Sequence, residues 1–269
     1  MLPDHSADRW TEDEWAAFRH AYSVLENACR GTLVLEPFEV VVAVEEYRRA
    51  WRPERTKVLL LAESHVFTQK NESVDLLESY VGRPEYASEP NRFVRFVYCP
   101  AYGENEMVHN PCSESGNRGT PQFWKIFYSC CNRITRHEDF FPVLKSGTVF
   151  EERISAKRGL LAEMKRRGIW LMDASIVGLY SPLFKKPAKK VIEHVVQTCW
   201  TLYIGKAIRE MLPDHIVVIG KGVWNILCER LNSGEIGCGV SVISQPQAHI
   251  SSKEQLAQFG LINSICSRY

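Results

Sequence analysis

Short apolar runs that end in polar turns alternate with longer amphipathic stretches along most of this chain. Thr11 and Glu14 form a capping box that opens a first helix, and apolar residues at helical spacing continue it until Gly31. A second helix is expected from residue 37 to about residue 51. Four β-rich apolar runs are too short for helices and are bounded by polar residues, which indicates buried strands. These strands are expected at residues 57–62, 169–173, 216–220 and 240–244.

Further helices are expected at residues 122–135, 154–167, 189–211 and 223–231 and from residue 252, and residues 92–98 form another candidate strand. Strands that alternate with helices predict an α/β fold in which helices cover both faces of a sheet. We therefore expect a three-layer α/β/α sandwich around a mostly parallel four-stranded sheet. Residues 1–56 are expected to form a helical extension packed on a domain of residues 57–269. Reactive groups should lie just beyond the carboxyl ends of the strands.

The bulk composition is that of a globular protein and excludes disordered and collagen-like chains, since 45% of the 269 residues are hydrophobic and 24% are charged. No apolar run approaches the roughly 20 residues that span a bilayer. The first residues lack the basic and apolar regions of a signal peptide, so we expect a cytoplasmic protein without a membrane partner. Because the net charge is only +1, any face that binds nucleic acid must be local.

The nine cysteines are odd in number and include no Cys-x-x-Cys pair, which favours reduced thiols over a disulfide framework or an iron–sulfur site. Cys99, His109 and Cys112 would supply only three of the four ligands of a structural zinc. We therefore expect neither a metal nor another cofactor.

Four short segments stand in a fixed order and combine apolar runs with polar turns. They read VLLLAESHVF (residues 58–67), TPQFWKIF (120–127), GIWLMDAS (168–175), and the pair VVIGKGVWNIL (217–227) with VISQPQAHIS (242–251). Each is weakly specific alone, but together they resemble the motifs of the uracil-DNA glycosylase superfamily over residues 58–252. The resemblance implies an enzyme that flips a base out of DNA and hydrolyses its N-glycosidic bond. We expect it to act as a monomer on DNA.

The stretch from Ala62 to Val66 is similar to the superfamily's first motif, which reads Gly-Gln-Asp-Pro-Tyr-His or Gly-Glu-Ala-Pro-Gly in different branches. The match places Glu63 at the second position, Ser64 where the uracil-specific branch has Asp, and His65 at the Pro. Cleavage of the bond leaves positive charge on the sugar, and Glu63 can stabilise that charge and orient water. Alternatively, Glu63 and His65 only cap a following helix.

The strand that ends in Asp173 is similar to the superfamily's Gly-Val-Leu-Leu-Leu-Asn strand, whose last residue reads the Watson–Crick edge of the base. An amide matches uracil, whereas a carboxyl group that carries a proton can accept from the amino group of cytosine and donate to its N3. Val66 replaces a Tyr that crowds C5 of the base in the uracil-specific branch. Phe123 aligns near an aromatic residue that stacks on the base, although such residues more often belong to the core. Together these residues predict a C5-modified cytosine, such as a hydroxymethylated or glucosylated one.

The superfamily's closing motif is His-Pro-Ser-Pro-Leu-Ser or a variant, and its His stabilises the departing base. Here Gln245 and Pro246 occupy the start of the motif, so the leading His is missing. Three groups are candidates for its role, namely His249, His65 and the neutral amide of Gln245. Ser251 and Ser252 lie where the last helix begins, a position suited to a phosphate.

Positive charge is clustered downstream of Asp173, where it can contact DNA phosphates. The cluster consists of Lys185, Lys186, Lys189 and Lys190. Lys221 lies in a Gly-Lys-Gly turn that resembles one in the mismatch-specific branch, whose backbone amides can meet a phosphate. A solvated helix face would give the same pattern of lysines.

The sequence therefore predicts a monofunctional DNA glycosylase, and the inferred base suggests a role in antiviral defence against modified phage DNA or in base-excision repair. One alternative is a nucleic-acid-binding protein on the same fold that has lost catalysis, because Ser64 and the missing His depart from the superfamily. Another is an unrelated α/β hydrolase or nucleotide-binding protein, but the chain has neither a Gly-x-Ser-x-Gly elbow nor a Walker motif.

Overall fold

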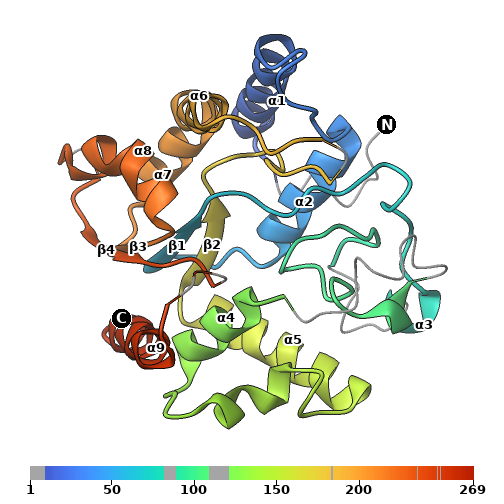
Figure 1. The fold of residues 1–269 in the computed structure, drawn as a ribbon, viewed down its shortest axis with the longest axis vertical. Helices are drawn as coiled ribbons and strands as arrows, with labels where there is room; N and C mark the ends of the chain where they lie inside the picture. Colours follow the sequence, from blue (N-terminus) through green and yellow to red (C-terminus); the bar gives the residue numbers. More distant parts are fainter. Residues whose placement is uncertain are drawn as a thin grey trace.

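The computed structural model of the protein describes residues 10–81, 89–108, 121–182, 184–234, 236–246, 248 and 250–269. At its centre lies a sheet of four parallel strands in the spatial order β2-β1-β3-β4 (Figure 1). The strands are β1 (Val58–Ala62), β2 (Ile169–Asp173), β3 (His215–Ile219) and β4 (Gly239–Ile243). Both β1 and β2 are buried along their whole length, as expected for strands covered on both faces. The register pairs Ala62 with Asp173, so these two strands end level with each other.

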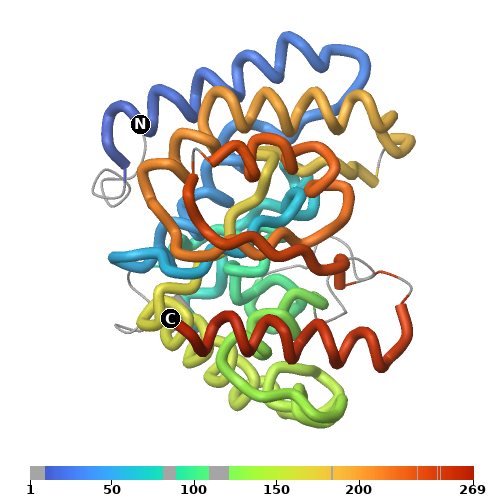
Figure 2. The backbone as a smooth tube through the Cα atoms, turned by 90° about the vertical axis from the view of Figure 1, so that its left-hand side faces the viewer, coloured from blue at the N-terminus to red at the C-terminus, as the bar shows by residue number. Residues whose placement is uncertain are grey.

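Helices cover both faces of the sheet (Figures 1 and 2). One layer contains α4 (Phe123–Cys131), α5 (Phe150–Arg166) and α9 (Ser252–Cys266). The other contains α1 (Glu12–Ala28), α6 (Lys189–Cys199), the π-helical segment η5 (Trp200–Ile204), α7 (Gly205–Met211) and α8 (Lys221–Asn232). In the first layer α4 packs on α5 and α9, and in the second α1 packs on α6 and η5. The structure thus confirms the predicted α/β fold with helices on both sides of a parallel sheet.

The N-terminal helices are part of the core. The first begins at Glu12, and its capping box is confirmed, because the Glu14 amide donates to the Thr11 hydroxyl at 3.1 Å and the Thr11 amide donates to the Glu14 carboxylate at 3.0 Å. The second helix, α2 (Phe38–Ala50), lies beside the edge strand β2, whose Trp170 indole donates to the backbone oxygen of Arg48 at 2.9 Å. Side chains of both helices share one hydrophobic cluster with the sheet. Any charged group of α2 that faces this core therefore needs a partner.

Two sequence predictions about secondary structure need correction. Residues 92–98 form turns instead of a strand, since the Phe96 amide donates to the Val94 carbonyl oxygen at 2.8 Å and strand-like pairing is limited to an isolated bridge between Asp75 and Arg92. The helix predicted over residues 189–211 is present, but its middle is π-helical. Three short segments were not predicted, namely α3 (Glu78–Val81) and the 3₁₀ helices η3 (Asn105–Met107) and η4 (His137–Val143).

Within the described ranges, no helix has both the length and the apolar character needed to cross a bilayer.

Candidate active site

The carboxyl end of the sheet carries a pocket of about 290 Å³. Its size is near the lower end of the ~300–1,000 Å³ typical of ligand pockets. Glu63 follows β1, Asp173 ends β2, and Gln245 comes two residues after β4, so the strand ends bring these side chains together. The lining of this pocket includes Glu63, Val66, Phe123, Asp173, Tyr180 and Gln245.

Glu63 is held on one side by a tyrosine that the sequence did not single out. The Tyr180 hydroxyl donates to Oε2 of Glu63 at 2.8 Å. Burial and the Glu63 carboxylate raise the pKa of Tyr180, so the hydroxyl keeps its proton and remains a hydrogen-bond donor. Nζ of Lys186 lies 5.7 Å from the centre of the Tyr180 ring, which places a cation beside this pair.

The other oxygen of Glu63 lies against the first turn of α8. Gly220, which precedes this helix, has a φ of +111°, a backbone conformation that side chains disfavour. A Cβ on Gly222 would lie only 3.3 Å from Oε1 of Glu63. The two glycines of the Gly-Lys-Gly turn therefore let the carboxylate approach the helix N-terminus, where the helix dipole favours negative charge.

Asp173 is buried at the base of the pocket, with 3% of its surface exposed, and forms an ion pair with α2. Nη2 of Arg48 lies 2.7 Å from Oδ2 of Asp173. Arg48 also pairs with Glu45 on the same helix, and its guanidinium lies 4.8 Å from the centre of the Phe96 ring. Oδ2 of Asp173 is therefore a hydrogen-bond acceptor for Arg48, and Asp173 also lines the pocket.

The imidazole of His65 is fully buried beside Asp173. Its Nε2 lies 2.8 Å from Oε2 of Glu36, and its Nδ1 lies 3.8 Å from Oδ2 of Asp173. Glu36 also accepts from the backbone amides of Thr68 at 2.6 Å and Gly178 at 2.8 Å. Burial alone would lower the pKa of His65, but the charge of Glu36, together with Asp173, raises it to about 9. His65 is therefore a buried cation at neutral pH.

The charge on His65 makes the stability of the protein depend on pH. Since the folded-state pKa of His65 is about 9 and the ordinary value is 6.5, its stabilising contribution is complete below pH 6.5 and is lost as the pH rises through 9. We expect a loss on the order of 3 kcal/mol across this window. Urea unfolding at pH 6, 7.5 and 9 measures it. A His65→Gln variant should lack this slope, and equal slopes in both proteins would contradict the assignment.

The two other residues predicted to contact a base both line the pocket. Val66 is 43% exposed, so its side chain faces solvent-accessible space. Phe123 is the first residue of α4 and is partly buried, whereas its neighbour Trp124 is completely buried in the core. Of the two aromatic residues, Phe123 is the one placed to meet a ligand.

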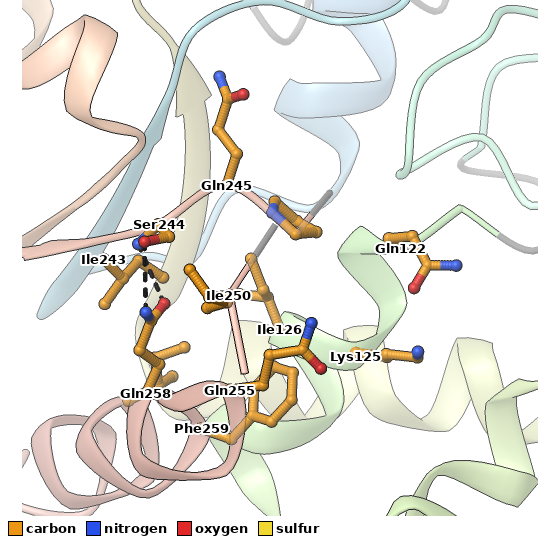
Figure 3. Close-up of a pocket in the computed structure, with 12 residues that line it drawn as sticks. Gln122, Lys125, Ile126, Ile243, Ser244, Gln245, Ile250, Gln255, Gln258 and Phe259 are labelled. Carbon is orange, nitrogen blue, oxygen red and sulfur yellow. Dashed lines mark hydrogen bonds between the residues drawn. The ribbon is translucent and has the colours of Figure 1, made fainter. Parts of the chain in front are cut away.

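The segment after β4 is fixed by α9. Figure 3 shows Gln258 hydrogen-bonded to Ser244, and both residues line a smaller pocket that shares Gln245 with the main one. The Ser244 amide donates to Oε1 of Gln258 at 3.0 Å, and Nε2 of Gln258 donates to the Ser244 hydroxyl at 3.3 Å. Gln245 then packs on Gly220, where a Cβ would lie 2.9 Å from Cγ of Gln245. Two of the three groups expected to replace the closing-motif His, Gln245 and His65, line the main pocket, although the His65 side chain is fully buried. His249 lies outside the described residues.

The residues expected to contact a DNA backbone are a set of lysines and two serines at the start of α9. Lys185, Lys186, Lys189, Lys190 and Lys221 are exposed, and Lys186 also lines the main pocket. Ser251 is the N-cap of α9, and its hydroxyl and backbone amide both donate to the Glu254 carboxylate, at 2.7 and 2.8 Å. A carboxylate of the protein therefore already binds at this helix N-terminus, next to Ser252, where a phosphate was expected.

Glu36, Arg48 and Tyr180 are the functional candidates that the sequence reasoning missed. A signal for Arg48 exists in retrospect, because α2 is buried over most of its surface and its charged residues must then be paired. The described cysteines are free thiols, and no group of three or more metal-ligating side chains occurs within the described ranges. Of the candidate zinc ligands, His109 and Cys112 lie outside those ranges.

Comparisons with protein-family models, curated proteins and solved structures found no match for this chain.

Proposed function

We propose that this protein is a DNA glycosylase that flips out a C5-modified cytosine and hydrolyses its N-glycosidic bond, leaving an abasic site. The observation that carries the proposal is that Glu63 and Asp173 line one pocket beyond the carboxyl ends of β1 and β2. Two carboxylates in one pocket can serve the two halves of a flipped nucleotide, one meeting the sugar and the other the base.

Glu63 is the group that acts on the sugar. Its charge stabilises the cation that develops as the glycosidic bond breaks, and its free lone pairs orient the attacking water. The hydrogen bond from Tyr180 fixes the carboxylate, so little reorganisation is needed when that cation forms.

Asp173 is the group that reads the base. An oxygen of its carboxyl group can accept a hydrogen bond from the exocyclic amino group of cytosine, whereas the same oxygen would repel O4 of uracil. Val66 leaves open the space around C5, and Phe123 offers an aromatic face to the ring. The amide of Gln245 is the donor available to the departing base.

A panel of DNAs tests this proposal. Single- and double-stranded DNAs that carry uracil, cytosine, hydroxymethylcytosine or glucosylated hydroxymethylcytosine are incubated with the protein, and abasic sites are then cut with alkali. We expect cuts at the modified cytosines and no complex trapped by borohydride, because hydrolysis by Glu63 and water needs no Schiff base. Efficient release of uracil with every cytosine derivative intact would contradict the assigned base. DNA binding without abasic sites in any substrate would favour the non-catalytic alternative.

The lysines should set the salt dependence of DNA binding. We expect replacement of Lys185, Lys189 and Lys190 by Gln to weaken binding and to reduce the slope of log K against log salt by about 2 to 3, since each phosphate contact contributes roughly 0.7–0.9. Fluorescence anisotropy at several salt concentrations measures the slope. Lys206→Gln on α7 is the control, because Lys206 pairs with Glu210 on its own helix. Identical slopes in the triple variant and the control would exclude this contact surface.

Gly222→Ala should slow base release without weakening the fold. The new Cβ would lie 3.3 Å from Oε1 of Glu63, so the carboxylate must shift by a few tenths of an ångström. We expect the single-turnover rate to fall about tenfold, because displaced catalytic groups lose rate steeply. The control is Gly260→Ala on α9, where a Cβ would meet no atom within 4 Å. The Gly260→Ala variant should keep the wild-type rate and gain about 0.4–1 kcal/mol of stability. An equal rate in the two variants would show that Glu63 tolerates displacement of its carboxylate.

A further inference from the structure

A chain of alternating charges runs through the buried base of the pocket. Glu36 contacts His65, His65 lies beside Asp173, and Asp173 pairs with Arg48, which in turn pairs with Glu45. None of these five side chains is more than 3% exposed. Buried charges persist only when each one is compensated, so each member of the chain constrains the charge of its neighbours.

The chain is anchored in the N-terminal helices. Glu45 and Arg48 belong to α2, and Glu36 lies just before that helix. Arg49, the next residue on α2, extends the network outward, because it pairs with Glu45 at 3.2 Å and with Glu14 of α1 at 3.0 Å. The Tyr203 hydroxyl of η5 also donates to Glu45 at 2.8 Å. The position of Arg48 is therefore fixed by α1, α2 and η5 together.

Arg48 contacts only one of the two oxygens of Asp173. Its Nη2 donates to Oδ2, the oxygen that also faces His65. No residue that the structure describes donates to Oδ1, and Asp173 lines the pocket. Arg48 therefore occupies one oxygen of Asp173, and the other oxygen can accept a hydrogen bond from a ligand. The ligand group that matches it is a donor such as an amino group.

We propose that the α1–α2 segment belongs to the base-reading site, and that Arg48 is a positioning residue that orients Asp173 as a hydrogen-bond acceptor and thereby selects a base with an exocyclic amino group. This inference rests on the proposed function, because it names the group that sets base selectivity in the same pocket. Glu36 acts from the opposite side, where it holds the His65 cation next to Oδ2 of Asp173. The N-terminal helices then set specificity as well as completing the core.

Two buried, paired arginines make a matched test. Arg48→Met removes the cation beside Asp173, while the control Arg153→Met removes a buried arginine of α5 that pairs with Glu104 at 2.7 Å, outside this network. For each variant, kcat/KM is measured on DNA with the modified cytosine and on DNA with uracil. We expect Arg48→Met to lower the ratio of kcat/KM for the modified cytosine to kcat/KM for uracil by about tenfold or more. This is the effect expected when one contact that reads the base is lost. Arg153→Met should leave the ratio unchanged, and Arg48→Lys, which keeps the charge, should restore most of it. An equal ratio in both Met variants would overturn the proposal.

A second measurement separates this inference from the proposed function. Unfolding free energies of Arg48→Met, Asp173→Asn and the double variant form a cycle that reports the coupling of the pair without any substrate. We expect the double variant to lose less unfolding free energy than the two single variants lose together. If the losses of the two single variants simply add up in the double variant, Arg48 does not hold Asp173. If the wild-type protein releases no base, the proposed function and base selection both fail, while the cycle still decides whether the pair exists.

Discussion

Replacement of Glu63 by Gln is expected to slow base release by at least about 10²–10³-fold, the loss seen when a group that stabilises transition-state charge is removed. A neutral amide has nearly the same shape as the carboxylate and keeps an oxygen for the Tyr180 hydroxyl, but it cannot stabilise a sugar cation. Binding of the modified DNA should change little, because Glu63 acts on charge that develops only during the reaction. Single-turnover rates and equilibrium binding of the same DNA measure the two effects separately.

Tyr180→Phe should cause a smaller loss of rate than Glu63→Gln and serves as the comparison. It removes the hydrogen bond to Oε2 of Glu63 while leaving the carboxylate charged. Its rate should fall by about tenfold, roughly what a hydrogen bond to a charged group contributes. A Glu63→Gln protein that works within threefold of the wild type would remove Glu63 from the mechanism.

The second large effect is expected at Asp173. Asp173→Asn should abolish release of the modified cytosine and bring release of uracil above that of the wild type, because an amide can donate to O4 and accept from N3–H of uracil. The single variant also leaves Arg48 without one of its two carboxylate partners, which should cost about 3–5 kcal/mol of stability. The double variant Arg48→Met/Asp173→Asn removes both charges and is the better test.

Competition between uracil DNA and modified-cytosine DNA in one reaction gives the change in preference directly. Val66→Tyr is the companion variant, because it narrows the space near C5 without touching the charges. It should discriminate against the modified base while leaving the Arg48–Asp173 pair intact. An Asp173→Asn protein, single or double, that still prefers the modified cytosine would show that this side chain does not read the base.

The sequence predicted the shared pocket because parallel topology determines where strand ends lie. Glu63 and Asp173 are 110 positions apart in the chain, yet each comes at the end of a short apolar run, and two such runs that pair in parallel end at the same edge. Phe123, which its motif made a candidate for stacking on a base, lines the pocket. Its position depends on where α4 begins, and the predicted start differed from the observed one by a single residue.

The partners of these residues could not be predicted in the same way. Arg48 meets Asp173 from a helix 125 positions earlier, and Glu36 meets His65 from the segment before that helix. Such contacts depend on how the N-terminal helices dock against β2, which periodicity does not encode. The buried pair also changes the chemistry, because Arg48 donates to one oxygen of Asp173, a residue that lines the pocket.

If Glu63 and Asp173 act as proposed, a cytosine-type base leaves the DNA as a free base. The most direct test is mass spectrometry of the small molecules released from DNA with hydroxymethylcytosine or its glucosylated form, with wild-type and Glu63→Gln protein side by side. We expect the free modified base, in amounts equal to the abasic sites, from the wild type alone. Release of a nucleoside, a nucleotide or a detached sugar, or of no product from any modified DNA, would show that the protein does not excise such a base.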